Sequence, residues 1–259
     1  MLIFLKLGGS LITDKSTPRT LRADTLARLM DEIVAALADV DAQVVLGHGS
    51  GSFGHVEGRR YGTRDGVRDA EGWRGFAEVQ AVAALLNRHV IDAARGAGLP
   101  VVNCPPSASA VCADGRLVEL ALAPIRSALE HGLIPVVFGD VALDRVRGGT
   151  IVSTEDVFGY LAPRLKPMRI LLAGRDLGVL TRWPDGELVT DIVDGMAIHA
   201  GAAQSTDVTG GMVAKIYETL AMLRAVPGST ALIFSGEVPG RLGAALRGDP
   251  VPGTELRAA

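Results

Sequence analysis

The chain alternates short apolar runs with longer stretches in which apolar residues recur every three or four positions. The continuous runs predict strands buried on both faces: residues 2–7, 43–46, 99–103, 133–138, 168–173 and 230–234. The periodic stretches predict helices with one apolar face: residues 21–37, 73–96, 124–132, 153–165, 240–246 and a segment that follows residues 207–212 and bears Lys215 and Leu220. This alternation predicts an α/β fold in which helices cover both faces of a mainly parallel sheet.

A glycine-rich segment, residues 47–55 (Gly-His-Gly-Ser-Gly-Ser-Phe-Gly-His), follows the second predicted strand. Ligands bind beyond the carboxyl ends of strands in such sheets, and glycines let backbone N–H groups approach an anion closely. We therefore expect residues 47–54 to form a phosphate-cradling loop, with His55 as a side-chain donor at its end. An ordinary glycine and serine turn with an incidental histidine is the alternative, because short glycine motifs recur by chance.

Three lysines lie in or beside Gly- and Ser-containing segments: Lys6, Lys15 and Lys215. Phosphoryl transfer requires charge neutralisation and in-line positioning more than covalent chemistry, and lysines with loop amides supply both. The chain has no G-x-x-x-x-G-K-[ST] loop, no protein-kinase signature set and no G-x-G-x-x-G at a helix start. These absences exclude a P-loop enzyme and a protein kinase, and they weaken the case for a Rossmann dehydrogenase.

Composition narrows the possible partners. The 259 residues have a formal net charge of −3 and contain only two cysteines, Cys104 and Cys112, which lack zinc spacing. Such a chain has no general attraction for nucleic acid or an anionic membrane, so any anion site must be local. No apolar run approaches the ~20 residues of a membrane span, and residues 1–5 lack a basic leader. We expect a cytoplasmic protein with reduced cysteines.

Four motifs together carry a family resemblance: residues 6–15 (Lys-Leu-Gly-Gly-Ser-Leu-Ile-Thr-Asp-Lys), the segment 47–55, residues 153–156 (Ser-Thr-Glu-Asp) and residues 207–215. The chain resembles the amino acid kinase superfamily over nearly its whole length and, within it, the isopentenyl phosphate kinase family. The resemblance implies a three-layer αβα sandwich, a single domain over 1–259 and a homodimer. It implies ATP-dependent phosphorylation of isopentenyl phosphate, with residues 1–165 on the acceptor side and 166–259 on the nucleotide side.

The resemblance also implies a role for individual residues. Its catalytic set is Lys6, Lys15, His55 and Lys215. Its ATP-binding set is Lys6, Gly8, Gly9, Ser10, Ser50, Asp176, Gly210, Gly211 and Lys215. Its acceptor-phosphate set is Gly49, Gly54, His55, Ser153 and Thr154. Mg²⁺ is expected to be held mainly by the phosphates of ATP, with no metal-binding side chains.

Three positions depart from the family pattern. Ser50 stands where a third consecutive glycine is usual, and residues 175–178 form a shorter loop near the nucleotide base. Thr154-Glu155 replaces a Gly-Asp pair. The acid that orders the lysines is therefore Glu155 or Asp156.

The acceptor's apolar tail requires a pocket, and the candidates are Phe76, Val79 and Ala83 on the long helix. Core packing explains the same residues equally simply. A fosfomycin-type phosphonate kinase shares His55 but would require a polar tail pocket. A non-catalytic nucleotide sensor of the same fold would not need all three lysines. Residues 57–72 are polar and Gly-rich, and are either a lid or an ordinary surface segment.

Overall fold

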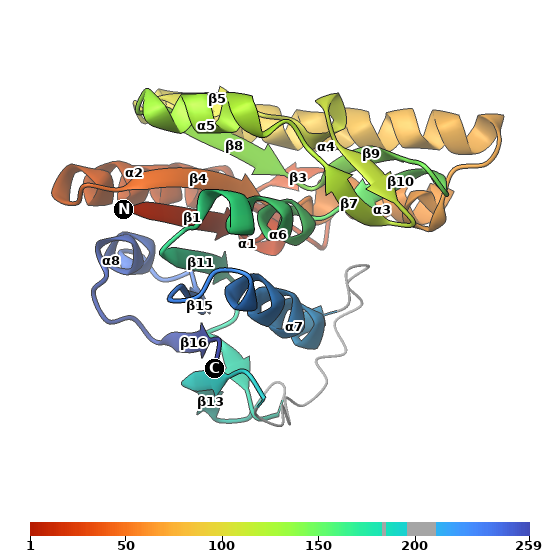
Figure 1. Cartoon of the computed structure of the whole chain (residues 1–259). Helices are drawn as coiled ribbons and strands as arrows, with labels where there is room; N and C mark the ends of the chain where they lie inside the picture. The colour runs from red at the N-terminus through yellow and green to blue at the C-terminus, as the bar shows by residue number, and fades with distance from the viewer. Residues whose placement is uncertain (183–184, 196–210) are drawn as a thin grey trace.

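Eight strands form the central sheet, in the order β14-β16-β15-β11-β1-β4-β8-β5 (Figure 1). The structure is a computed structural model that describes residues 1–182, 185–195 and 211–259, with the backbone alone at 55 and 56. Neighbouring strands from β15 to β5 are parallel, whereas β16 is antiparallel to β15 and β14 runs parallel to β16. The strands are β1 Leu2–Leu7, β4 Gln43–His48, β5 Val101–Asn103, β8 Ile134–Phe138, β11 Arg169–Gly174, β14 Asp191–Val193, β15 Thr230–Ser235 and β16 Gly253–Arg257.

Helices cover both faces of this sheet, so the molecule has three layers (Figure 1). One face is covered by α2 Ala23–Asp39, α8 Arg241–Arg247 and the C-terminal half of α4 Ala70–Gly96. The other is covered by α5 Leu122–Glu130, α6 Thr154–Leu165 and α7 Gly211–Arg224. The layered α/β fold expected from the alternation of strands and helices is therefore confirmed.

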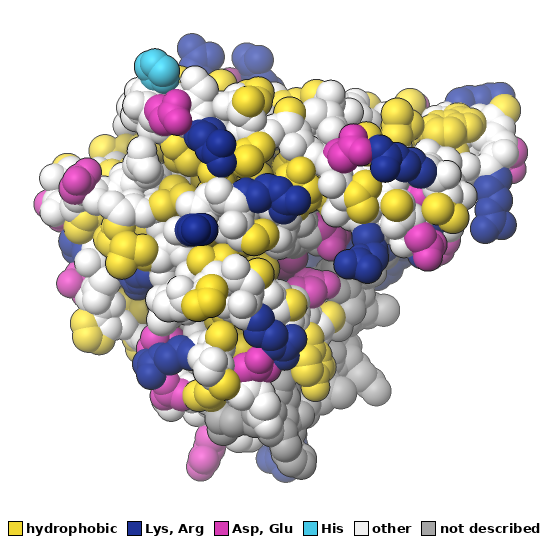
Figure 2. All heavy atoms as spheres, viewed as in Figure 1, with side chains coloured by type: hydrophobic (Ala, Val, Ile, Leu, Met, Phe, Trp, Pro, Cys, Tyr) yellow, Lys and Arg dark blue, Asp and Glu magenta, His cyan; other side chains and the backbone are white. Residues whose placement is uncertain are grey.

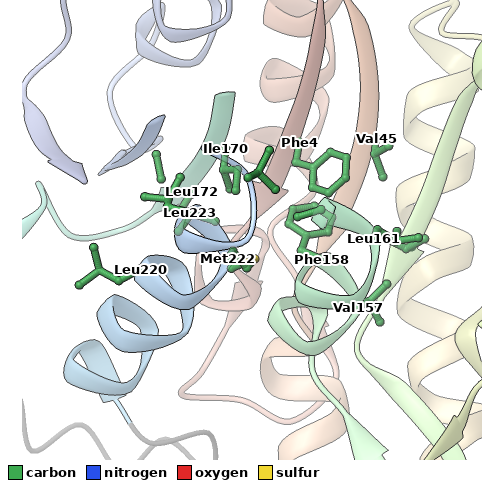
Figure 3. Close-up of a cluster of buried hydrophobic side chains, with 14 of the residues drawn as sticks. Phe4, Val45, Val157, Phe158, Leu161, Ile170, Leu172, Leu220, Met222 and Leu223 are labelled. Carbon is green, nitrogen blue, oxygen red and sulfur yellow. The ribbon is translucent and has the colours of Figure 1, made fainter. Parts of the chain in front are cut away.

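Each strand serves two cores because successive side chains point to opposite faces. In β1, Leu5 and Leu7 belong to the core under α2, whereas Phe4 belongs to the core under α6. The rings of Phe4 and Phe158 face one another with centroids 4.8 Å apart (Figure 3). The same alternation places Lys6 on the α6 face of the sheet, and this determines its partner in the site.

A smaller sheet, in the order β10-β9-β6-β7, lies against the N-terminal half of α4. It consists of two hairpins, β6 Val111–Ala113 with β7 Arg116–Glu119 and β9 Asp140–Asp144 with β10 Gly148–Val152. Asp114 and Gly115 both have positive φ, as a two-residue Asp-Gly hairpin turn requires. The long helix therefore covers the main sheet with one half and faces the smaller sheet with the other.

The predicted glycine loop over 47–54 is too long. Helix α3 (Gly51–Tyr61) begins inside it and continues into the first part of the segment 57–72. The rest of that segment contains η1 (Thr63–Asp65) and the start of α4 at Ala70. Ser50 makes no side-chain cap for α3; instead Ser52 N donates to Thr13 Oγ1 at 2.9 Å. Because this cap comes from a residue 39 positions away, local sequence does not reveal the helix start.

The remaining elements are short. They are α1 Gly9–Ile12, the hairpin β2 Thr13–Asp14 with β3 Thr20–Leu21, η2 Pro106–Ala108 and the hairpin β12 Val179–Leu180 with β13 Leu188–Val189. The apolar pattern predicted neither hairpin nor β14, because two or three residues are too few to show a period. Residues 183–184 lie outside the described residues, as do residues 207–210, the first part of the fourth motif.

Lys and Arg side chains lie among Asp and Glu side chains on the face shown in Figure 2. This mixture agrees with the small net charge. Across the described ranges, no helix has both the length and the apolar character needed to cross a membrane.

Candidate active site

The main cavity opens at the carboxyl ends of four adjacent parallel strands. Each of these strands ends at or just before a glycine that lines the cavity: Gly8 after β1, Gly49 after β4, Gly139 after β8 and Gly174 closing β11. The cavity measures about 1280 Å³ including its open mouth. This is the position at which open α/β sheets bind ligands.

Two glycine segments, the first at Gly8-Gly9 and the second at Gly49–Gly51, approach one another backbone to backbone at the floor of the cavity. A Cβ on Gly9 would lie 2.6 Å from Gly51 Cα, and a Cβ on Gly49 would lie 2.9 Å from Gly9 N. No side chain fits at either position, so both residues must be glycine for the segments to approach this closely. The floor therefore consists of exposed peptide groups, with the N-terminus of α3 beside them, and this suits a phosphate.

Lys6 and Glu155 form a buried ion pair across this floor. Lys6 projects from β1 and Glu155 from the first turn of α6; each is 8% exposed, and Lys6 Nζ donates to Glu155 Oε1. Burial by itself would raise the pKa of Glu155. The charges of Lys6 and Lys215 and the hydrogen bond from Lys6 outweigh it and hold this pKa below its ordinary value. The carboxylate thus sits between two of the three expected lysines.

Asp156 has a different function in the same turn. Its carboxylate accepts from Ser153 N at 2.7 Å and from Ser153 Oγ at 2.8 Å, while Ser153 Oγ accepts from Asp156 N. This reciprocal capping box begins α6. Of the two acids left open by the sequence, Glu155 is the one that contacts a lysine.

Ser153 and Thr154 are expected to contact the acceptor, and the hydroxyl groups of both already have partners. Ser153 Oγ is held in the capping box, and Thr154 Oγ1 donates to His48 O at 2.6 Å. The ring of His48 is buried, with its nitrogens 3.1 Å from Asn87 Oδ1 and 3.2 Å from Gly49 O. Burial lowers the pKa of His48. These contacts connect the start of α6 to the segment His48-Gly49. Ser153 and Thr154 also line the cavity.

Lys15 reaches the cavity from the β2–β3 hairpin, where it is exposed. The hairpin is fastened to α3 by several contacts. Thr13 Oγ1 accepts from Ser52 N and donates to Gly9 O at 2.7 Å, and Arg19 pairs with Glu57. The lysine that extends over the site is thus carried by a small, anchored element.

The end of the cavity at which the nucleotide is expected is lined by residues after β11 and on α7. Asp176 and Arg175 come from the first segment, and Met212 and Lys215 from the second. Arg175 Nε lies 3.0 Å from Glu237 Oε1, so its guanidinium already has a carboxylate partner. The guanidinium of Arg175 is therefore held in place by Glu237.

The opposite end of the cavity has an apolar wall. Val79 and Ala83 of α4 line it, together with Ile151 of β10. Phe76 does not line the cavity: its ring packs edge-on against Trp73 and lies beside Gly149. Two of the three residues proposed for the tail pocket thus face the cavity.

The structure brings most of the expected site residues to this one cavity. Those that line it are Lys6, Gly8, Gly9, Ser10, Lys15, Gly49, Ser50, Gly54, Val79, Ala83, Ser153, Thr154, Asp176 and Lys215. Gly211 is the buried first residue of α7 with positive φ, next to Met212. Gly210 and the side chain of His55 lie outside the described residues.

Among the cavity residues that sequence reasoning missed are Arg64, Asp140, Ile151 and Arg175. Ile151 belongs to a hairpin strand and Arg64 to an arginine-rich segment, so neither stands out locally. Among the described residues, no three His, Cys, Asp or Glu side chains converge as a metal site.

The chain belongs to the amino acid kinase family, whose model matches residues 1–235. Within that family, its similarity to isopentenyl phosphate kinases is confirmed. The isopentenyl phosphate kinase of Methanothermobacter thermautotrophicus is 37% identical over 98% of both chains. That of Haloferax volcanii is 38% identical over 99% of this chain and 98% of its own length. A solved structure titled "X-ray structures of isopentenyl phosphate kinase" superimposes with a TM-score of 0.86 at 34% identity, covering 99% of this chain and 100% of that one.

Proposed function

We propose that this chain transfers the terminal phosphoryl group of ATP to isopentenyl phosphate, giving isopentenyl diphosphate and ADP. The observation that carries the proposal is one continuous cavity with a polar floor, built from backbone groups and lysines, and an apolar wall at one end. A phosphorylated acceptor with a short hydrocarbon tail matches that combination. Relatives similar over 98% or more of this chain are named for the same activity.

In the proposed reaction, an oxygen of the acceptor phosphate attacks the γ-phosphorus of ATP. A P–O bond forms there as the bond to the β,γ-bridging oxygen breaks, and ADP leaves. A phosphate monoester is already largely ionised near neutral pH, so the acceptor oxygen needs positioning more than a strong base. His55, on α3, is assigned to that positioning by the family resemblance.

The lysines neutralise the charge that develops during transfer. Lys6 and Lys15 act on the transferring group, Lys215 acts from the nucleotide side, and Glu155 keeps Lys6 and Lys215 in place. Gly8, Gly9, Ser10, Ser50, Asp176, Gly210 and Gly211 complete the ATP side. Gly49, Gly54, Ser153 and Thr154 complete the acceptor-phosphate side. Mg²⁺ would enter bound to the phosphates of ATP, as the family resemblance implies.

The proposal also covers how the two parts of the chain divide the site and how the chain assembles. Residues 1–165 would supply the acceptor side and residues 166–259 the nucleotide side of a single domain. Val79 and Ala83 line the proposed tail pocket; Phe76 would act behind that wall. We expect a homodimer in the cytoplasm, as the family resemblance implies.

An ADP-release assay with Mg-ATP tests the proposal. The acceptors are isopentenyl phosphate, dimethylallyl phosphate, fosfomycin and a panel of amino acids. Turnover of the isoprenoid monophosphates alone is expected. Turnover of fosfomycin alone would make the chain a phosphonate kinase, and ATP binding without turnover of any acceptor would favour a nucleotide sensor.

A further inference from the structure

Arg64 is a cavity-lining cation without a function in the scheme above. It lies in η1, between α3 and α4, and its side chain is 35% exposed. Its nearest carboxylate among the described residues is that of Asp156, with 3.9 Å between Arg64 Nη2 and Asp156 Oδ2. That separation is too long for a hydrogen bond. Within the described part of the chain, the guanidinium donates no hydrogen bond, although it can donate five.

The backbone of Arg64 is fixed while its side chain has no close partner. Arg64 O accepts from Thr150 Oγ1 at 3.0 Å and from Arg147 Nη1 at 3.4 Å, and both donors belong to the β9–β10 region. The neighbouring Thr63 is buried, and Val67 N donates to Arg147 O at 2.8 Å. The segment is thus fastened to the smaller sheet at Arg64 itself and at Val67, so a ligand needs to order only the arginine side chain.

The position of Arg64 matches the acceptor end of the cavity. Ile151, one residue from Thr150, belongs to the apolar wall, and its Cδ1 would lie 3.2 Å from a Cβ on Gly58 of α3. Asp156, the nearest carboxylate to Arg64, is in the first turn of α6, which also contains Thr154 and is capped by Ser153. The other cavity arginine, Arg175, is at the nucleotide end and is paired with Glu237.

We propose that Arg64 binds the phosphate group of the acceptor, an inference that rests on the proposed function. A guanidinium presents paired N–H donors that match two oxygens of a phosphate, and such charge-assisted bonds are strong. Leaving Asp156 costs little, because a partly exposed ion pair at 3.9 Å contributes little stability and Asp156 retains its bonds to Ser153. Arg64 therefore selects acceptors that carry a phosphate dianion.

The test compares Arg64→Gln with Arg68→Gln. Arg68 is an exposed arginine on the same segment and does not line the cavity, so both variants lose one positive charge from the same region. We expect Arg64→Gln to raise KM for isopentenyl phosphate by roughly 10–100-fold, the range for one lost charge-assisted hydrogen-bond set. KM for ATP and kcat should change less than about threefold, because the contact is made equally in ground and transition states. Arg68→Gln should match the parent protein.

Calorimetric titration of isopentenyl phosphate without nucleotide distinguishes a failure of the Arg64 assignment from a failure of the proposed function. If the parent protein binds isopentenyl phosphate and turns it over, and Arg64→Gln binds it equally well, the assignment of Arg64 is wrong. A rise in KM for ATP instead would move Arg64 to the nucleotide. If the parent protein neither binds nor phosphorylates isopentenyl phosphate, the proposed function itself fails. Arg64→Lys, which keeps the charge and loses the paired donors, should lie between the parent protein and Arg64→Gln.

Discussion

Glu155 is a single carboxylate on which two lysines depend. It accepts from Lys6 Nζ inside the protein, and the charge of Lys215 also lowers its pKa. Removing it leaves two ammonium groups near one another, of which Lys6 is 8% exposed and without its counter-charge. The penalty for breaking a buried pair exceeds what the pair contributes when intact. Glu155 is thus required for the arrangement of the lysines, although it need not touch a substrate.

We predict that Glu155→Gln lowers the free energy of unfolding by about 3 kcal/mol and lowers kcat by about 100-fold. Glu155→Asp keeps the charge with a shorter reach and should recover most of the stability. Urea unfolding and steady-state kinetics measure the two effects. An unchanged kcat in Glu155→Gln would show that the lysines hold their positions without this acid.

The residues of the site differ in how well sequence reveals them. The glycines at strand ends and the lysines beside them can be predicted from the sequence, because few functions other than phosphate binding require that local pattern. Arg64 and Ile151 are not visible, because their placement depends on how η1 and β10 pack beside the cavity. Choosing between Glu155 and Asp156 also required the structure, since both are acids in one helical turn and only their directions differ.

At the scale of elements, the β2–β3 hairpin positions Lys15. Its central anchor is Thr13, which is buried and whose hydroxyl both caps α3 through Ser52 N and donates to Gly9 O. One hydroxyl thus joins the hairpin, the start of α3 and the first glycine segment. Loss of that hydroxyl removes the cap from the buried Ser52 N, whereas Gly9 O still accepts from Thr13 N.

We predict that Thr13→Val lowers the free energy of unfolding by about 2 kcal/mol and kcat by about tenfold, because Lys15 loses its fixed position. Thr17→Val is the matched control, since Thr17 is exposed in the turn of the same hairpin. Thermal unfolding and ADP release are the measurements. Equal effects of the two substitutions would mean that the hairpin is held by other contacts.

The backbone contact between the glycine segments leads to a second element-scale prediction. A methyl group on Gly9 would meet the backbone of Gly51, which cannot move aside as a side chain can. Gly9→Ala should therefore separate the segments, cost about 2 kcal/mol and weaken ATP binding. Gly96→Ala at the end of α4 meets nothing within 4 Å and should be neutral or slightly stabilising. Titration with ATP and thermal unfolding would test this; tight ATP binding by Gly9→Ala would contradict it.

At the scale of the whole molecule, the layered sheet follows from sequence because its strands are continuous apolar runs and its helices keep a clear period. The edge strand β14 and the two short hairpins do not, since each is held by pairing rather than by its own pattern. Helix α3 shows the same limit: its first turn contains Gly51 and Gly54, and its cap comes from Thr13. Structure that depends on distant partners has no local signal.

The charges around the site also make the stability of the whole chain depend on pH through Glu218 of α7. Burial raises the pKa of Glu218 to about 7, with further contributions from Glu155 and Asp156, against smaller opposing effects of Lys6 and Arg64. Its ordinary value is 4.5, so between pH 4.5 and about 7 the folded state holds a proton that the unfolded state has lost. Stability therefore falls as the pH rises through that window, and the full penalty remains above it.

Glu218→Gln removes this penalty, so we expect it to raise Tm at pH 8 and to leave Tm nearly unchanged at pH 4.5. The expected rise is ~2–4 °C, the effect of about 1 kcal/mol in a chain of this size once partial exposure is discounted. Glu78→Gln, on the exposed face of α4, loses the same charge away from the site and should not show the difference between the two pH values. Thermal unfolding of the three proteins at both pH values measures it. A Tm change in Glu218→Gln that is equal at pH 4.5 and pH 8 would show that its carboxyl is ionised in the folded protein throughout, and that the lysines and Arg64 offset the two neighbouring acids.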